Sequence, residues 1–100
     1  MTEVMEIVKV LEENAVEDIK VLDIRSINPV LCDYMIIGTG YTSDHILSVG
    51  EKIVERFGGK LEGTEGSVWV LVDLGDIMVH LFTAQAREFY GLEELYAEDT

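Results

Sequence analysis

The sequence predicts a single domain of the α/β class over residues 1–100, with a mixed central sheet of about four to five strands flanked by helices. Two observations support this prediction. Apolar residues recur at helical spacing in some segments and form short β-branched runs in others, in the order helix, strand, strand, helix, strand, strand, helix. A hydrophobic content of 48% excludes a disordered chain, and 100 residues are enough for one self-sufficient core.

The first two elements are a helix near the N-terminus and a strand over residues 18–24. Thr2 is a suitable cap for the helix, which is expected to end at residues 12–14. Its apolar face consists of Val4, Ile7, Val8 and Leu11. In the strand, apolar and polar residues alternate until the phase slips between Val21 and Leu22. The slip indicates either a bulge or burial on both faces of the strand.

A second strand over residues 34–37 leads into a second helix. The glycines of residues 38–40 are expected to turn the chain tightly between the two elements. The helix should begin at Thr42 or the next residue, because both can cap it, and should end at the Gly-Gly pair of residues 58–59. Residues 60–67 are polar and rich in glycine, so they are interpreted as a connector.

The strongest local pattern predicts a β-hairpin in the second half of the chain. Residues 68–74 and 77–82 are two runs rich in Val, Ile, Leu, Trp and Phe, and the short turn Gly75-Asp76 separates them. A polar break follows at Thr83, after which apolar residues up to position 96 recur at helix-like spacing. The chain is therefore predicted to end in a hairpin, a helix and an aromatic tail.

The glycines of Gly38-Thr39-Gly40 invite comparison with a phosphate-binding loop. A Walker loop requires Gly-Lys-Ser/Thr, and a dinucleotide fingerprint requires a third glycine at the start of the helix; the sequence contains neither at this place. One enzymatic alternative is kept: a small nucleotidyltransferase-like enzyme or nucleotide-binding domain that uses these glycines together with Asp73 and Asp76.

No catalytic or metal-binding residue and no cofactor are predicted. A triad of Ser67, His80 and Asp73 would lack the nucleophile elbow. A metal site built from His80, Asp73 and Asp76 would match no standard ligand spacing. His80 is therefore interpreted as a structural or interface histidine, with its nitrogens held by neighbouring carboxylate or backbone groups.

The charge of the chain restricts its partners. The net charge is −13, which opposes contact with a phosphate backbone, so little direct binding to nucleic acid is expected. Residues 61–100 carry nine acidic side chains against one base, Arg87. This excess either serves solubility or steers the protein towards a basic partner.

Features of the chain favour a reducing, cytoplasmic setting. Cys32 is the only cysteine, which excludes an internal disulfide, and its position beside Asp33 favours a buried, inert thiol. No apolar run approaches the roughly 20 residues that span a membrane, so no membrane contact is expected. The acidic N-terminal stretch resembles neither a signal nor a transit peptide.

Aromatic residues gather in the last third of the sequence. Five of the eight are Trp69, Phe82, Phe89, Tyr90 and Tyr96. They either close a small core or form part of a protein-binding surface, where Trp, Tyr and Arg supply much of the binding energy.

Two ordered patterns connect this region to a known family. Residues 69–82 read W-x-L-x-D-x-G-D-x-x-V-H-x-F, and residues 87–95 read R-x-F-Y-x-L-E-x-L. Upstream, residues 33–40 contain Asp-Tyr and Ile-Ile-Gly-Thr-Gly, and His45 follows near the start of a helix. Taken together, these motifs resemble the ribosomal silencing factor family, also called RsfS or Iojap.

The resemblance implies a nucleotidyltransferase-like fold without catalysis. It implies binding to the large ribosomal subunit through its basic protein fourteen, which would block association with the small subunit and repress translation initiation under nutrient limitation. It also implies self-association as a homodimer. The candidate partner-binding residues are Trp69, Asp73, Asp76, His80, Phe82, Arg87, Tyr90, Glu93 and Tyr96. Of these, Trp69 and Phe82 are alternatively core residues.

Overall fold

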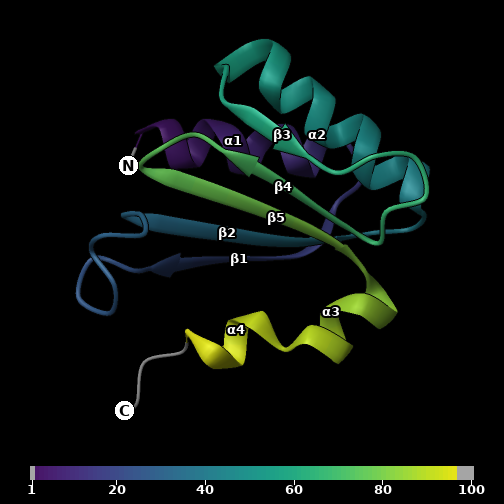
Figure 1. Ribbon diagram of the computed structural model, residues 1–100. Helices are drawn as coiled ribbons and strands as arrows, with labels where there is room; N and C mark the ends of the chain where they lie inside the picture. Colours follow the sequence, from purple (N-terminus) through teal and green to yellow (C-terminus); the bar gives the residue numbers. More distant parts are fainter. Residues whose placement is uncertain (1, 97–100) are drawn as a thin grey trace.

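A five-stranded mixed sheet forms the centre of the computed structural model, which describes residues 2–96 (Figure 1). The elements in chain order are α1 (Thr2–Glu13), β1 (Glu17–Asp23), β2 (Tyr34–Gly40), α2 (Ser43–Phe57), β3 (Lys60–Glu62), β4 (Trp69–Asp73), β5 (Ile77–Thr83), α3 (Ala84–Tyr90) and α4 (Leu92–Leu95). The strands lie in the order β1-β2-β5-β4-β3; β2 and β5 are parallel, and the other neighbours are antiparallel. The predicted α/β class with a mixed sheet is confirmed.

The helices cover both faces of this sheet. Helices α1 and α2 lie on one face, and α3 and α4 lie on the other (Figure 1). The larger apolar cluster, under α1 and α2, includes Ile7, Leu11, Ile46, Ile53, Val72 and Val79. The smaller one, under α3 and α4, consists of Ile24, Cys32, Met35, Ile37, Phe82 and Ala86. Because both faces are covered, β2 and β5 are nearly continuous apolar runs instead of alternating ones.

The predicted hairpin joins β4 to β5. Gly75 has a φ of +87°, and its N–H donates to the Asp73 carboxylate at 2.9 Å. The N–H of Leu74 donates to the carbonyl of Ile77, which closes the turn. A glycine suits this turn because it reaches a positive φ without steric cost.

The glycines at positions 38 and 40 lie inside β2, so the prediction of a tight turn there is wrong. The strand pairs with β1 as far as Thr39 and with β5 as far as Gly40. A Cβ at Gly38 would lie 2.5 Å from Cγ1 of Val16, and a Cβ at Gly40 would collide with Ile46. Close packing against neighbouring side chains, which a sequence pattern does not reveal, is the reason for glycine at both positions.

The interpretation of residues 60–67 as a connector is wrong for its first part. Lys60–Glu62 forms the short edge strand β3, which pairs with residues 71–73 of β4. Pairing with β4, the next strand along the chain, overrides the weak local preference of so short and polar a stretch.

The bulge in β1 lies before the position of the phase slip. Glu17 is opposite Thr39, and Lys20 is opposite Ile37, so two residues of β1 face one of β2. Asp18, within the bulge, has a φ of +50°. The irregularity points the carbonyl group of Asp18 out of the regular ladder, as bulges commonly do.

Two contacts at the start of α2 connect it to other parts of the chain. The hydroxyl of Thr42 accepts the N–H of His45 at 3.0 Å, which confirms the predicted cap. The ring of His45 in turn accepts the N–H of Tyr41 through Nδ1 and donates from Nε2 to the carbonyl of Asn14 at 2.7 Å. His45 therefore has a structural role, since both of its nitrogens are engaged by the backbone.

Candidate functional site

Strands β4 and β5 place aromatic side chains on the sheet face that α3 and α4 partly cover. Trp69 is the register partner of Phe82, and Leu71 is the partner of His80, so all four lie on this face. Tyr90, at the end of α3, contacts Trp69, and it lines a shallow hollow together with Phe89 and with Val68, which lies just before β4. We call the surface formed by Val68, Trp69, Phe89 and Tyr90 the aromatic face.

The rings of this surface are in contact with one another. The ring centroid of Trp69 lies 4.8 Å from that of Tyr90 and 4.9 Å from that of Phe82. Phe89 meets Tyr90 edge to face at 5.1 Å. Phe89 is nevertheless 81% exposed, Tyr90 49% and Val68 44%, whereas Phe82 is fully buried. A contiguous exposed apolar patch of this kind typically marks an interaction site.

His80 supports the aromatic face from beneath. It is only 5% exposed, and its Nδ1 accepts the Nε1–H of Trp69 at 3.0 Å. Because Nδ1 is the acceptor, the proton of the neutral ring is on Nε2, which has no partner among residues 2–96. Burial lowers the pKa of His80 to about 4, so the ring is neutral at pH 7. The expectation of carboxylate or backbone partners is wrong for Nδ1, which binds an indole instead.

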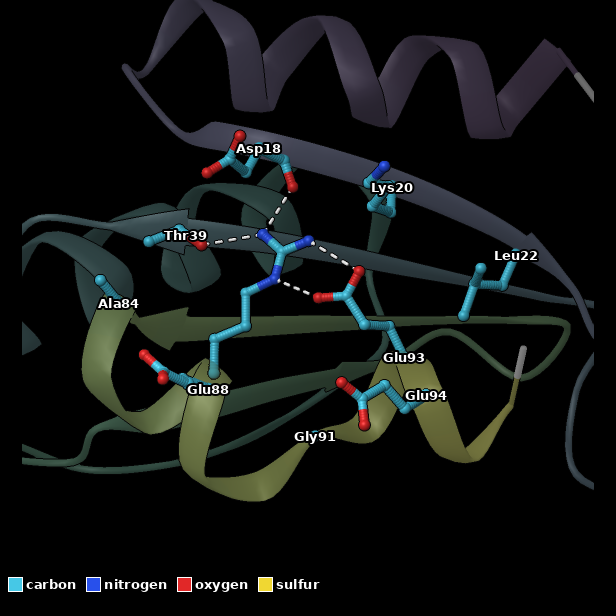
Figure 2. A pocket seen from close by; sticks show the side chains of 10 residues that line it. Asp18, Lys20, Leu22, Thr39, Ala84, Glu88, Gly91, Glu93 and Glu94 are labelled. Atoms are coloured by element: carbon cyan, nitrogen blue, oxygen red, sulfur yellow. Dashed lines mark hydrogen bonds and ion pairs between the residues drawn. The ribbon is translucent and has the colours of Figure 1, made fainter.

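A second cluster, around Arg87, holds the C-terminal helices against the sheet. The guanidinium of Arg87 forms a fork with Glu93, with Nε 2.7 Å from Oε1 and Nη2 3.3 Å from Oε2. Its Nη1 donates to the carbonyl of Asp18 and, at 2.8 Å, to the hydroxyl of Thr39. These partners come from β1, β2 and α4, and they converge on one point in Figure 2. The guanidinium holds the pKa of Glu93 below its usual range.

The Arg87 cluster lies in a groove of about 630 Å³ between β1 and the C-terminal helices, with Lys20, Leu22, Glu88 and Glu94 at its borders (Figure 2). A groove of this size has room for a small ligand. The strongest anion-binding group in the groove is the guanidinium of Arg87. Its Nε and both of its terminal nitrogens already donate to protein acceptors. The groove is therefore interpreted as the contact region that holds α3 and α4 against β1 and β2, and not as an anion-binding site.

Of the remaining candidate residues, the two aspartates lie away from the aromatic face. Asp73 is at the opposite end of β4 from Trp69, where its carboxylate supports the hairpin turn. Asp76 lies in that turn, and its carbonyl accepts the N–H groups of Asp33 and Tyr34. Tyr96 packs on the smaller apolar cluster. The structure thus brings Trp69, Tyr90, His80 and Phe82 together, joins Arg87 to Glu93, and separates the two aspartates from them.

Val68 and Phe89 were not among the candidate residues. The pattern R-x-F-Y contained Phe89, but helical spacing alone did not distinguish its exposed position from a buried one. Only the placement of α3 against β5 shows that Phe89 points outward.

The arrangement offers little support for nucleotide chemistry. The backbone of Gly38-Thr39-Gly40 takes part in strand pairing, whereas a phosphate-binding loop needs amides free to face the ligand. Within residues 2–96 no cluster of three or more His, Cys, Asp or Glu side chains is placed to bind a metal. Over the same residues, no helix has the length and apolar character to cross a membrane.

Comparisons with known proteins agree on one family. The family described as "Ribosomal silencing factor during starvation" matches residues 1–100. The chain is 32% identical to the ribosomal silencing factor of Zymomonas mobilis, over 86% of this chain and 72% of that protein. It is also 32% identical to that of Bacillus subtilis, over 87% and 78% of the two chains. A solved structure from Chromobacterium violaceum superposes with a TM-score of 0.81 at 27% identity, covering 99% of this chain and 88% of that one.

Proposed function

Since the chain belongs to the ribosomal silencing factor family, we propose that it represses translation by occupying the large ribosomal subunit and blocking its association with the small subunit. The protein acts by occupancy and not by catalysis. The proposed contact on the large subunit is its basic protein fourteen, and repression serves conditions of nutrient limitation.

The exposure of Phe89 and Tyr90 beside half-buried Trp69 is the observation that carries this proposal. Rings of this kind, held in place from beneath, supply large contact area at low entropic cost when a partner covers them. His80 and Phe82 lie under the face and support it without reaching a partner.

Charge supplies the second part of the mechanism. Nine acidic residues lie between positions 61 and 100, against the single base Arg87, which Glu93 already neutralises. The resulting field accelerates encounter with a basic ribosomal protein, and it does so less as salt increases. The aromatic contacts then determine how long the complex lasts.

The test is co-sedimentation of the purified protein with isolated large subunits and, separately, with isolated small subunits, at low and moderate salt. We expect association with the large subunit alone, weakening as salt rises. Light scattering should then show that the bound protein prevents the two subunits from joining. Absence of association with either subunit would reject the proposed function.

Self-association through the aromatic face is a related proposal. An exposed patch that one copy presents is available to a second copy as well, so a symmetric dimer would cover Phe89. Sedimentation velocity of the wild type and of Phe89→Ser tests this: a dimer that persists in the variant places the dimer interface elsewhere.

A further inference from the structure

A shallow hollow beside the aromatic face combines an aromatic ring, an aliphatic side chain and a carboxylate. Its volume is about 350 Å³, and its lining residues are Glu62, Gly63, Trp69 and Leu71. Glu62 of β3 is the register partner of Leu71 of β4. Trp69 lies two residues before Leu71, so the three side chains are on the same face of the sheet. The hollow is therefore built by strand pairing and has a defined chemical composition.

The indole of Trp69 offers this hollow a ring and no hydrogen-bond donor. Its Nε1–H is already donated to His80 at 3.0 Å, and its ring is in contact with Tyr90 and Phe82. An indole engaged in this way attracts a ligand through its π face, and tryptophan is the best of the aromatic side chains for binding cations.

The carboxylate of Glu62 supplies the matching charge. Glu62 is exposed, and the ion pairs within residues 2–96 are Arg25–Asp23 and Arg87–Glu93, so no cation neutralises it there. The cation of β3, Lys60, is the register partner of Asp73 at the far end of β4 from Trp69. The hollow therefore presents an uncompensated negative charge beside an aromatic ring.

Resting on the proposed function, we propose that this hollow receives an arginine side chain of the basic ribosomal protein. The guanidinium stacks on Trp69 and donates to the carboxylate of Glu62, while the aliphatic stem lies along Leu71. Arginine fits better than lysine, because its planar group stacks on an aromatic ring and offers a fork of N–H donors to a carboxylate.

A nucleobase stacked on Trp69 is the competing occupant, and the charges disfavour it. A nucleotide would bring its phosphate towards Glu62 and into the field of a chain with a net charge of −13. The two occupants respond in opposite ways to removal of the carboxylate charge, which makes them distinguishable by experiment.

The test compares Glu62→Gln with Glu55→Gln for binding to isolated large subunits. Glu55 lies on α2, on the opposite face of the sheet, and is exposed like Glu62, so each variant removes one surface charge. Melting curves establish that both variants fold. We expect Glu62→Gln to weaken binding by about 5- to 30-fold, and Glu55→Gln to change it by less than about twofold.

Each outcome decides the proposal separately from the proposed function. Equal affinities of the two variants overturn the arginine site while ribosome binding stands. Tighter binding by Glu62→Gln overturns it in favour of an RNA base. Failure of the wild type to bind rejects the proposed function itself.

A direct probe reports on the hollow without the ribosome. Trp69 is the only tryptophan of the chain, so its fluorescence comes from this place alone. Argininamide at millimolar concentration should change the emission of the wild type in a saturable way, and the uncharged isostere citrullinamide should not. The change should be lost in Glu62→Gln and kept in Glu55→Gln. An identical response to both compounds overturns the arginine site.

Discussion

Trp69 and His80, on neighbouring strands, are joined by a hydrogen bond in which the indole N–H donates to Nδ1 of the imidazole at 3.0 Å. The bond determines the tautomer of the buried histidine and the orientation of the half-exposed ring above it. It couples the stability of the sheet to the geometry of the aromatic face, and it requires a neutral His80.

Acid should weaken the fold through His80. Its pKa falls from 6.5 to about 4 in the folded state because burial disfavours the imidazolium. The unfolded chain therefore binds a proton between these values when the folded chain does not. This contribution to stability is complete above pH 6.5 and is lost as the pH falls towards 4, amounting to about 3 kcal/mol in all.

Urea denaturation at several pH values between 7.5 and 4.5 measures this effect. The control is His80→Gln, whose amide can accept the N–H of Trp69 but does not titrate. The free energy of unfolding of the wild type should fall more steeply between pH 6.5 and 4.5 than that of the variant. Parallel profiles would show that burial of His80 does not shift its titration.

Replacement of Phe89 by serine should separate binding from stability. The side chain is 81% exposed, so the free energy of unfolding should change by less than about 0.5 kcal/mol. Affinity for the large subunit should fall at least about tenfold if Phe89 is an anchor of the interface. Met5→Ser is the control: Met5 is 69% exposed on α1, away from the aromatic face, and its replacement should leave binding unchanged.

Phe82→Ala should show the opposite behaviour. Phe82 has no exposed surface, so its truncation leaves a cavity and costs about 3–5 kcal/mol of folding stability. A melting curve measures the loss. A variant that melts like the wild type would contradict the buried position of Phe82.

The guanidinium fork of Arg87 should matter more than a surface ion pair. Arg87→Lys keeps the charge but loses the fork to Glu93 and one or more of the bonds to Asp18 and Thr39, which should cost about 1.5–3 kcal/mol. Arg25→Lys is the matched control, because the Arg25–Asp23 pair is exposed and should contribute nothing measurable. Denaturant titration of both variants makes the comparison, and equal stabilities would contradict a structural role for the Arg87 cluster.

Gly91 should tolerate asparagine better than alanine. It lies between α3 and α4 with a φ of +56°, in the left-handed region, and a Cβ added there would meet only a carboxylate oxygen of Glu94, at 3.9 Å. Gly91→Ala should therefore cost about 1 kcal/mol for backbone strain alone, and Gly91→Asn less, because asparagine adopts this conformation more readily. Chemical denaturation of the two variants gives the order; a more stable alanine variant would show that the junction relaxes.

Part of the candidate site could be predicted from the sequence. The hairpin placed Trp69, His80 and Phe82 near one another, because strand alternation and a short turn determine which side chains share a face. The sequence did not separate buried Phe82 from exposed Phe89, since both are aromatic residues in apolar patterns. Nor did it join Arg87 to Asp18, which lies 69 positions away in the chain.

The sequence by itself determined the class of the fold, the hairpin, the cap of α2 at Thr42 and the acidic character of the chain, because these depend on composition and on residues close in the chain. The tertiary structure decided that Lys60–Glu62 becomes an edge strand and that Gly38 and Gly40 lie inside β2. It also decided which aromatic rings stay exposed. These outcomes depend on contacts between separate elements of the chain, where pairing and close packing outweigh local preference.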